Sequence, residues 1–343
     1  MYSENYLTDW FIRNWTNRPL FRTTLIFTIL ATAQALLLRF GDSGFGIINW
    51  LNVWINMLRE YAGVGIVALG MTFVIVCGGV DLSAGAAAAA VSAVVILFVD
   101  SGQHGILQIL GINGTPAYAA AVCAGIIFGA FLGFVTGFIV TRGNIPSFIV
   151  TLGMMMIYRS LTQHIMTDIT PDIPTEFKRI ALTEAAGMAV LPIMYWIILA
   201  ALLHIILKRT VFGKYIIAVG SSEKAAWLAG VNVNRVKRRV YMLAGVLTAI
   251  TAIIQVSAAG TPDYGNAGSG YATEAIAACV LGGTRLGGGR GYIAGAIMGT
   301  MIIAVINNMP GLMSISPYMR DACKGAVIIM AVLLQRKKYS FEL

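Results

Sequence analysis

A glycine-rich stretch that interrupts a long apolar run carries the most distinctive side chains for chemistry. Gly78 and Gly79 are followed by Asp81 and Ser83, and an alanine-rich run begins after them. An ionised aspartate in hydrocarbon costs roughly 2.5–3.5 kcal/mol on insertion scales, so this acid must lie at an interface, line a polar cavity or bond to a helix end. Two roles follow for Asp81 and Ser83: capping the free amides of the next helix, and moving with the turn as a gate.

A second glycine turn lies near the other end of the chain. Gly282 and Gly283 open the stretch GGTRLGGG (282–289), which aligns on its double glycine with GGVDLSAG (78–85). The match predicts an internal repeat, a common feature of transporters, and gives Gly282 and Gly283 the same candidate gating role. The turn is no phosphate-binding loop, because it lacks the lysine of that motif and lies between apolar runs.

Residues suited to catalysis or metal binding are scattered along the chain. His104, His164 and His204 fall in three separate segments, and the four cysteines lie in or beside apolar runs without a Cys-x-x-Cys pair. Neither His-Glu-x-x-His nor Gly-x-Ser-x-Gly occurs within an apolar run. We therefore expect no catalytic residue, no metal site, no cofactor and free buried thiols.

One hydrophilic loop, 208–239, is long and strongly basic. Two serines precede Glu223, which is typical of a helix start, and Ala225 and Ala226 begin a short apolar face. Gly230 is placed to end this helix. Such a helix suits either docking to a soluble partner or lying on anionic lipid headgroups, and the loop by itself favours neither.

The composition decides where these motifs reside. The 343 residues are 58% hydrophobic and 11% charged, whereas soluble domains are about 45–50% apolar and about 25% charged. This excludes a soluble enzyme, a disordered protein and a nucleic-acid binder. The sequence therefore predicts an all-α, multi-pass membrane protein, and its net charge of +9 is interpreted as a topology signal.

Apolar runs place the membrane helices. A span needs about 20 apolar residues. We expect about ten spans, of which the eighth is short, near 22–38, 55–77, 83–99, 117–140, 146–166, 188–207, 240–259, 271–284, 291–309 and 318–335. The chain is thus divided into an N-terminal segment (1–21), a transmembrane domain (22–335) and a C-terminal tail (336–343).

Lysine and arginine orient these spans. With the N-terminus inside and alternating spans, most of the 24 basic residues fall in inside segments, above all in 208–239. The main outside loop, 167–187, carries prolines and acids. By the positive-inside rule both termini, and the loop 208–239, are predicted to be cytoplasmic.

Small and polar residues within the spans suggest how the helices pack. Glycines recur every four residues in two ladders, at Gly125, Gly129, Gly133 and Gly137 and at Gly291, Gly295 and Gly299. This spacing predicts closely packed helices, with a mobile interface as the functional alternative. Candidate pathway-lining residues are Thr72, Thr151 and Asn307, although a helical Thr commonly bonds its own backbone.

Four stretches together resemble the membrane permease of bacterial ABC importers for simple sugars, the ribose, arabinose, xylose and galactose type. They are ALGMTFVIVCGGVDLSAG (68–85), IVTRGNIPSFIVTLGMMMIYRS (139–160), TVFGKYIIAVGSSEKAAWLAGVNVNRVK (210–237) and LGGTRLGGGRG (281–291). The resemblance implies a cytoplasmic-membrane subunit with three kinds of partner. These are ATP-binding subunits, an extracytoplasmic sugar-binding protein, and a second permease, either an identical or a related chain.

The resemblance also assigns roles to residues. The loop helix with Glu223, Ala225, Ala226 and Gly230 would dock on the ATPase, whose cycle would drive alternating access. One segment departs from the family pattern: Gly270-Tyr271 is followed by Ala and Thr, so that Glu274 is its single acid. This departure fits a different sugar or a different subunit role.

Two alternatives remain open from the sequence. An ABC permease could carry a branched-chain amino acid or a nucleoside on much the same framework. An ion-coupled secondary transporter would need an intramembrane ionisable group for coupling, for which Asp81 is the first candidate.

Overall fold

The computed structural model describes residues 19–41, 47–102, 105–112, 114–143, 145–167, 169–185, 188–259 and 266–312, with a few isolated positions beyond 312. The last predicted span (318–335), the C-terminal tail (336–343) and nearly all of the N-terminal segment (1–21) lie outside these residues.

Helices make up almost all of the described chain. In chain order they are α2 (Pro19–Gly41), α3 (Ile47–Val76), α4 (Ala84–Val99), α5 (Ile106–Ile109), α6 (Thr115–Arg142), α7 (Ser147–Met166), α8 (Thr175–Leu182), α9 (Leu191–Arg209), α10 (Val211–Ser221), α11 (Glu223–Leu228), α12 (Val233–Ala259), α13 (Tyr271–Leu281) and α14 (Ile293–Leu312). Two short strands, β1 (Glu184–Ala185) and β2 (Met188–Ala189), pair antiparallel between α8 and α9. The all-α prediction is confirmed, with this hairpin as its one small exception among the described residues.

Five of the described helices are long and apolar enough to cross a membrane: Leu20–Arg39, Asn49–Val76, Thr115–Arg142, Leu191–Arg209 and Val233–Ala259. Each matches a predicted span. The predicted span 271–284 differs, because its helix α13 has 11 residues and covers about 16 Å, half of a bilayer core of about 30 Å. α13 is therefore a half-helix.

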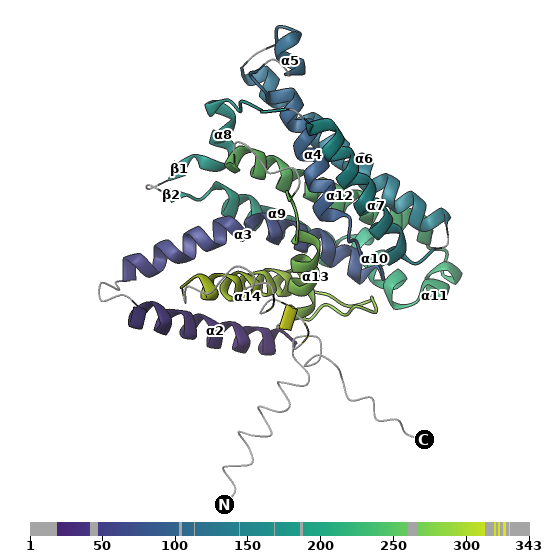
Figure 1. The fold of residues 1–343 in the computed structure, drawn as a ribbon. Helices are drawn as coiled ribbons and strands as arrows, with labels where there is room; N and C mark the ends of the chain where they lie inside the picture. The colour runs from purple at the N-terminus through teal and green to yellow at the C-terminus, as the bar shows by residue number, and fades with distance from the viewer. Residues whose placement is uncertain are drawn as a thin grey trace, which may run out of the picture.

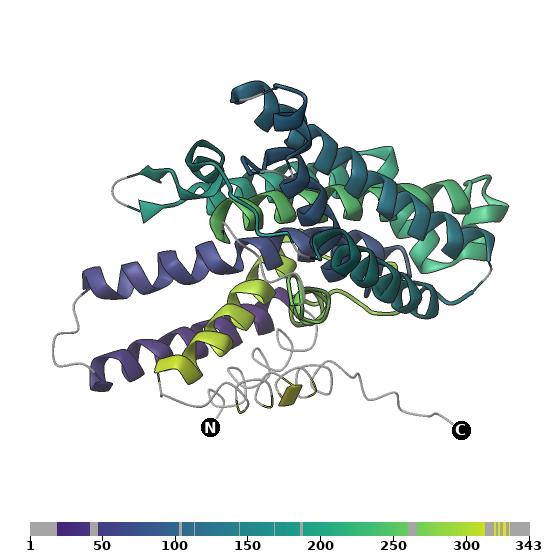
Figure 2. The same ribbon diagram turned by 45° about the horizontal axis from the view of Figure 1, so that its top comes forward.

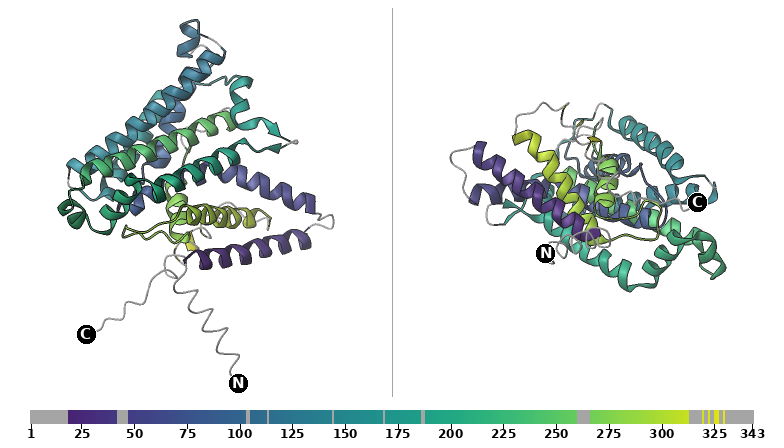
Figure 3. Two further views of the ribbon diagram at one scale, coloured as in Figure 1. Left: turned by 180° about the vertical axis from the view of Figure 1, so that it is seen from behind. Right: turned by 90° about the horizontal axis from the view of Figure 1, so that it is seen from below.

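Two groups of helices surround the central helix α3, whose apolar stretch is 83% buried. α2 and α14 lie against each other, and α14 also packs on α3, in one group (Figure 1). α4, α6, α7 and α12 form the other group, in which α12 packs most closely on α6 and also contacts α3 (Figure 2). α13 lies between the groups and contacts α3, α4 and α14, as the opposite view also shows (Figure 3).

The first glycine ladder forms the contact between α6 and α12. A Cβ on Gly133 would overlap the Tyr241 carbonyl oxygen and lie 3.0 Å from the Met242 Cα. A Cβ on Gly129 would lie 2.7 Å from the Gly245 carbonyl oxygen. The predicted close helix packing is confirmed, because only glycine lets the two backbones approach this far.

The second ladder joins α14 to the half-helix α13. A Cβ on Gly295 would overlap the Gly282 carbonyl oxygen, and one on Gly299 would overlap the Ala278 carbonyl oxygen. The small residues that fix this pair therefore include Gly282, one of the two glycines predicted to gate.

We expect Gly133→Ala to lower the stability of the protein by about 1–3 kcal/mol, the usual cost of overpacking a close contact. The shift should appear as a lower midpoint of thermal unfolding in detergent. The matched control is Gly153→Ala on α7, where a Cβ meets no atom within 4 Å. Equal midpoints for the two variants would contradict the close packing at Gly133.

Large apolar side chains cover the outward faces of α6, α7 and α9, the surface that a bilayer would contact. The most exposed are Ile127, Phe131, Phe148, Ile149, Met156, Ile157, Ile197, Ile198, Leu202 and Ile205. Exposed apolar patches of this extent are absent from soluble monomers, so these faces fit contact with lipid.

Candidate functional site

Gly78 ends α3 and starts the first predicted gating turn. Its φ of +89° is a left-handed conformation, which glycine adopts without steric cost. The amide of Gly78 donates to the Ile75 carbonyl at 2.9 Å, and the amide of Gly79 donates to the Val74 carbonyl at 2.9 Å. These two bonds satisfy carbonyls at the helix end and turn the chain away from it.

Asp81 holds the start of α4. Its carboxylate is 6% exposed and accepts hydrogen bonds from the Ser83 amide (2.9 Å) and the Ser83 hydroxyl (2.6 Å). Burial raises the pKa of the Asp81 carboxyl, and the two bonds from Ser83 oppose that rise. Asp81 thus accepts an amide next to the helix start, whereas the Ser83 side chain caps no amide of α4.

Side chains from two other helices fasten this turn. The Val80 amide donates to the Ser147 hydroxyl at 3.1 Å, and the Tyr241 hydroxyl donates to the Val80 carbonyl at 3.3 Å. Thr151, a candidate pathway residue, donates to the same carbonyl at 3.4 Å. α7 and α12 are therefore both hydrogen-bonded to the turn, and Thr151 is one of the residues that hold it.

The second turn has the same local geometry as the first. Gly283 has a φ of +85°, its amide donates to the Val280 carbonyl, and the Thr284 amide donates to the Cys279 carbonyl, both at 2.9 Å. The residue equivalent to Gly78 is thus Gly283. Pairing the two double glycines residue by residue, as the sequence alignment did, is wrong by one position.

Both turns meet at the end of α10. A Cβ on Gly220 would overlap the Val76 carbonyl oxygen and lie 2.7 Å from the Gly289 amide nitrogen. The Gly289 amide donates to the Val76 carbonyl at 2.9 Å, and a Cβ on Gly288 would lie 3.1 Å from the Gly78 Cα. We call Gly78, Gly220, Gly288 and Gly289 the glycine junction.

Sequence reasoning missed Gly220 and Gly288 as functional residues. Both stand in stretches that carry the family resemblance, but neither belongs to a glycine ladder or to either of the two double glycines on which the turns were aligned. No local signal marks them, because their role depends on α3, α10 and the 282–291 turn meeting in space.

α11 follows the junction directly and begins and ends as predicted. The Ser222 hydroxyl accepts from the Ala225 amide at 3.2 Å. Gly230, with φ +81°, donates its amide to the Trp227 carbonyl at 2.9 Å. Serine starts this helix and glycine ends it, and Ser222 is the single residue between α10 and α11.

The exposed face of α11 differs from the predicted docking set. Ala226 is 5% exposed and so seats the helix on the protein, and Glu223 forms an ion pair with Lys237 of α12. Trp227 is 66% exposed and Leu228 is 69% exposed. Leu228 belongs to the apolar face predicted from the sequence, although it was not among the docking residues, and Trp227 was missed. Both are large apolar side chains in a basic loop, which was the signal.

Thr72 and Asn307, the other candidate pathway residues, lie in different surroundings. Thr72 is fully buried, donates to the Ala68 carbonyl at 2.8 Å and lies 3.3 Å from the Cys279 sulfur. It therefore fastens α3 to α13. Asn307 is partly exposed and donates to the Glu274 carboxylate at 3.2 Å.

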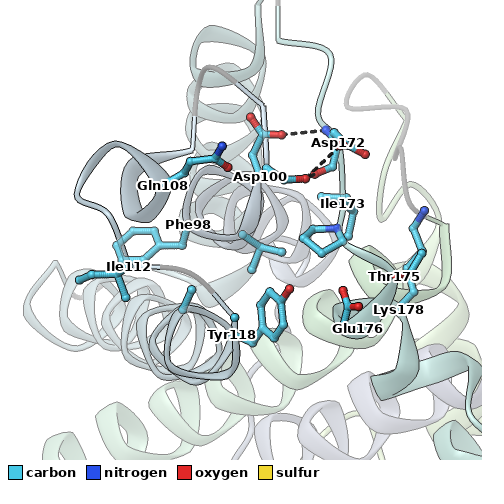
Figure 4. Close-up of a pocket in the computed structure, with 15 residues that line it drawn as sticks. Phe98, Asp100, Gln108, Ile112, Tyr118, Asp172, Ile173, Thr175, Glu176 and Lys178 are labelled. Atoms are coloured by element: carbon cyan, nitrogen blue, oxygen red, sulfur yellow. Dashed lines mark hydrogen bonds between the residues drawn. The ribbon is translucent and has the colours of Figure 1, made fainter.

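A pocket of about 540 Å³ lies far from α11, between the end of α4, α5, the start of α6 and the segment before α8 (Figure 4). Asp100 is 2% exposed and accepts from the Asp172 amide at 2.7 Å, and Ser101 donates to the Asp172 carboxylate at 3.0 Å. Figure 4 shows Tyr118 and Glu176 on the wall that faces these acids. The segment 167–187, predicted to be outside, supplies two of the three acids that line this pocket, Asp172 and Glu176.

The described residues hold no group of three or more His, Cys, Asp or Glu side chains that could bind a metal ion. The polar chemistry of the described chain is thus concentrated in the turns, the cluster around Asn307 and the pocket near Asp100.

This chain is similar to known membrane permeases over most of its length. A family model described as "Branched-chain amino acid transport system / permease component" matches residues 53–332. The ribose import permease protein RbsC of Bacillus subtilis is 39% identical over 292 residues, which are 84% of this chain and 85% of that protein. No solved structure matches.

Two further relatives widen the comparison. The probable ABC transporter permease protein YphD of Escherichia coli is 33% identical over 307 residues, 89% of this chain and 87% of that protein. The galactose/methyl galactoside import permease protein MglC of Haemophilus influenzae is 30% identical over 332 residues, 94% of this chain and 96% of that protein.

Proposed function

Because this chain belongs to the family of branched-chain amino acid transport system permease components, we propose that it is the permease subunit of an ABC importer that carries a simple sugar across the bacterial cytoplasmic membrane. The single observation that carries the cargo class is the likeness to ribose and galactoside import permeases over nearly the whole chain. Branched-chain amino acids, named in the family's description, are the second candidate.

The energy source in this proposal is ATP hydrolysis on a partner chain. The exposed Trp227 and Leu228 on α11 supply an apolar contact surface, and buried aromatic anchors dominate the free energy of such contacts. α10, the helix directly before α11, contains Gly220 and so links this contact surface to the glycine junction. Movement of α11 by the ATPase therefore acts directly on the turns after α3 and after α13.

In this proposal, alternating access results from movement at the glycine junction, which connects α3 with the turn between α13 and α14. α3 ends at Val76, just before Gly78, and the 282–291 turn separates the half-helix α13 from α14. A shift at Gly220 changes the angle between these elements, while the glycine ladders let α6 slide on α12 and α14 slide on α13. Packed interfaces of this kind have discrete arrangements, which is what a two-state transporter needs.

The extracytoplasmic partner in this proposal is a sugar-binding protein. The pocket beside Asp100 opens in the region predicted to face outside, and it carries Asp172, Glu176 and Lys178 around Tyr118. A mixed polar and aromatic rim of this kind suits a transient protein contact. A second permease, identical or related, would complete the pathway.

The ion-coupled alternative is less well supported. Its first candidate, Asp81, accepts two hydrogen bonds from Ser83 and holds the start of α4. An ion-coupling carboxylate needs access to the ion, and 6% exposure leaves Asp81 little.

Uptake by cells that express the chain with its ATPase and binding protein tests the cargo class. We expect accumulation of labelled D-ribose or D-galactose and none of labelled leucine. Leucine uptake without sugar uptake would assign the chain to the amino-acid branch of the family.

A further inference from the structure

The partly exposed polar cluster at the start of α13 has properties that neither turn nor pocket explains. Asn307 donates through Nδ2 to the Glu274 carboxylate at 3.2 Å. The Tyr61 hydroxyl lies beside Asn307, with Glu60, Tyr271 and Glu274 around it. We call Glu60, Tyr61, Tyr271, Glu274 and Asn307 the polar cluster.

The polar cluster lies where several helices converge. A Cβ on Gly63 of α3 would lie 3.7 Å from the Tyr271 hydroxyl, and a Cβ on Gly85 of α4 would lie 3.7 Å from the Tyr271 Cβ. Gly85 and Gly268 approach so closely that neither has room for a side chain. The starts of α4 and α13 thus meet beside the middle of α3, an arrangement of interrupted helices that binds substrates in other transporters.

Two exposed charged residues of α3 are poorly suited to contact with lipid. Glu60 and the adjacent Arg59 are exposed although they lie in α3 within the predicted span 55–77, near its outer end, in a helix long enough to cross the membrane. A charged side chain inside a span faces the interior of a bundle or a water-filled cavity. The surface that carries the polar cluster therefore faces a pathway or a second permease.

Hydrogen-bonding groups without partners continue from the cluster along α2 and α3. Among the described residues, buried atoms with no partner include Asn307 Oδ1, Gln34 Oε1, Trp50 Nε1, Asn52 Oδ1 and Trp54 Nε1. Buried polar atoms are nearly always bonded, so unbonded ones leave hydrogen bonds that water or a solute can supply.

We infer that the polar cluster binds the sugar during its passage, and this inference rests on the proposed function. A carboxylate accepts hydrogen bonds from two hydroxyl groups, and an amide side chain both donates and accepts hydrogen bonds. Glu274 and Asn307 together therefore match neighbouring hydroxyls of a neutral monosaccharide. The rings of Tyr61 and Tyr271 supply apolar faces for its C–H groups.

The test uses the full transporter, with ATPase and binding protein, in proteoliposomes that take up labelled D-ribose. Sugar moved and ATP hydrolysed are measured together for Glu274→Gln and Asn307→Asp. We expect each variant to move about tenfold less sugar per ATP, the loss of one good hydrogen bond, while hydrolysis stays unchanged. The matched control is Gln163→Asn, an exposed amide side chain near the end of α7, for which both rates should stay unchanged.

A more conservative variant tests the same site if Glu274→Gln or Asn307→Asp folds poorly. Tyr61→Phe removes one hydroxyl and retains the ring, and we expect it to change the ratio of D-ribose to D-galactose uptake. Equal falls in sugar uptake and ATP hydrolysis, or no change in either, would overturn the sugar site and assign the cluster to contact between permeases or to the fold. A wild-type transporter that hydrolyses ATP but moves no sugar would instead contradict the proposed function.

Discussion

Replacing Gly220 with alanine is expected to abolish transport while the ATPase still binds and hydrolyses ATP. The added Cβ would overlap the Val76 carbonyl oxygen and press on the Gly289 amide, both of which are backbone atoms with no flexible end to move. The hydrogen bond between Gly289 and Val76 (2.9 Å) would have to lengthen or break. Since α11 lies beyond Gly220, its docking surface stays intact.

The measurement is sugar uptake and ATP hydrolysis by the same reconstituted complex. We expect uptake to fall by more than about tenfold, since a strain of 1.4 kcal/mol already changes an equilibrium about tenfold. Gly153→Ala, with open space around its Cβ, should leave both rates unchanged. Normal uptake by the Gly220→Ala transporter would show that the glycine junction does not carry the coupling.

The second large effect is expected at Trp227. Changing it to glutamate should prevent the ATPase from co-purifying with the permease, because the side chain is 66% exposed and a buried aromatic anchor is worth about 2–4 kcal/mol in an interface. The permease itself should unfold at its normal temperature, since this side chain contributes little to the core.

Two further variants make this result specific. Trp227→Phe retains an aromatic anchor and should restore most of the binding. Tyr215→Glu changes an aromatic side chain of α10 that is 43% exposed and should leave co-purification unchanged. If α11 rests on lipid headgroups instead, Trp227→Glu will weaken membrane contact and leave ATPase binding as it was.

The sequence was informative wherever a signal is local. Runs of apolar residues located the long helices, and the four-residue glycine period identified the face of α6 that meets α12. Ser222 and Gly230 marked the ends of α11 because capping depends on residues within one turn of the helix end. These features need no knowledge of distant contacts.

Features that depend on distant contacts were missed or misjudged. The predicted span 271–284 has the hydropathy of a membrane helix, but α13 starts beside Gly85 of α4 and is too short to cross. Composition cannot show where an apolar segment starts relative to the bilayer. Thr72 and Thr151 illustrate the same limit, because their hydroxyls bond backbone atoms and a neighbouring thiol in ways that only the folded chain specifies.

The alignment of the two glycine turns shows how matching letters can pair the wrong residues. GGVDLSAG and GGTRLGGG both begin with a double glycine, yet the left-handed glycines of these two pairs are Gly78 and Gly283. Position relative to the helix end, and not the order of letters, determines which glycine turns the chain.

The most direct test of an ATP-driven sugar permease is D-ribose uptake into proteoliposomes that contain this chain, its ATPase and its binding protein, measured with ionophores present. We expect uptake to require ATP hydrolysis and to persist when all ion gradients are dissipated. Uptake that proceeds without the ATPase, or that stops when the gradients collapse, would contradict an ABC importer and return Asp81 to consideration as an ion-coupling residue.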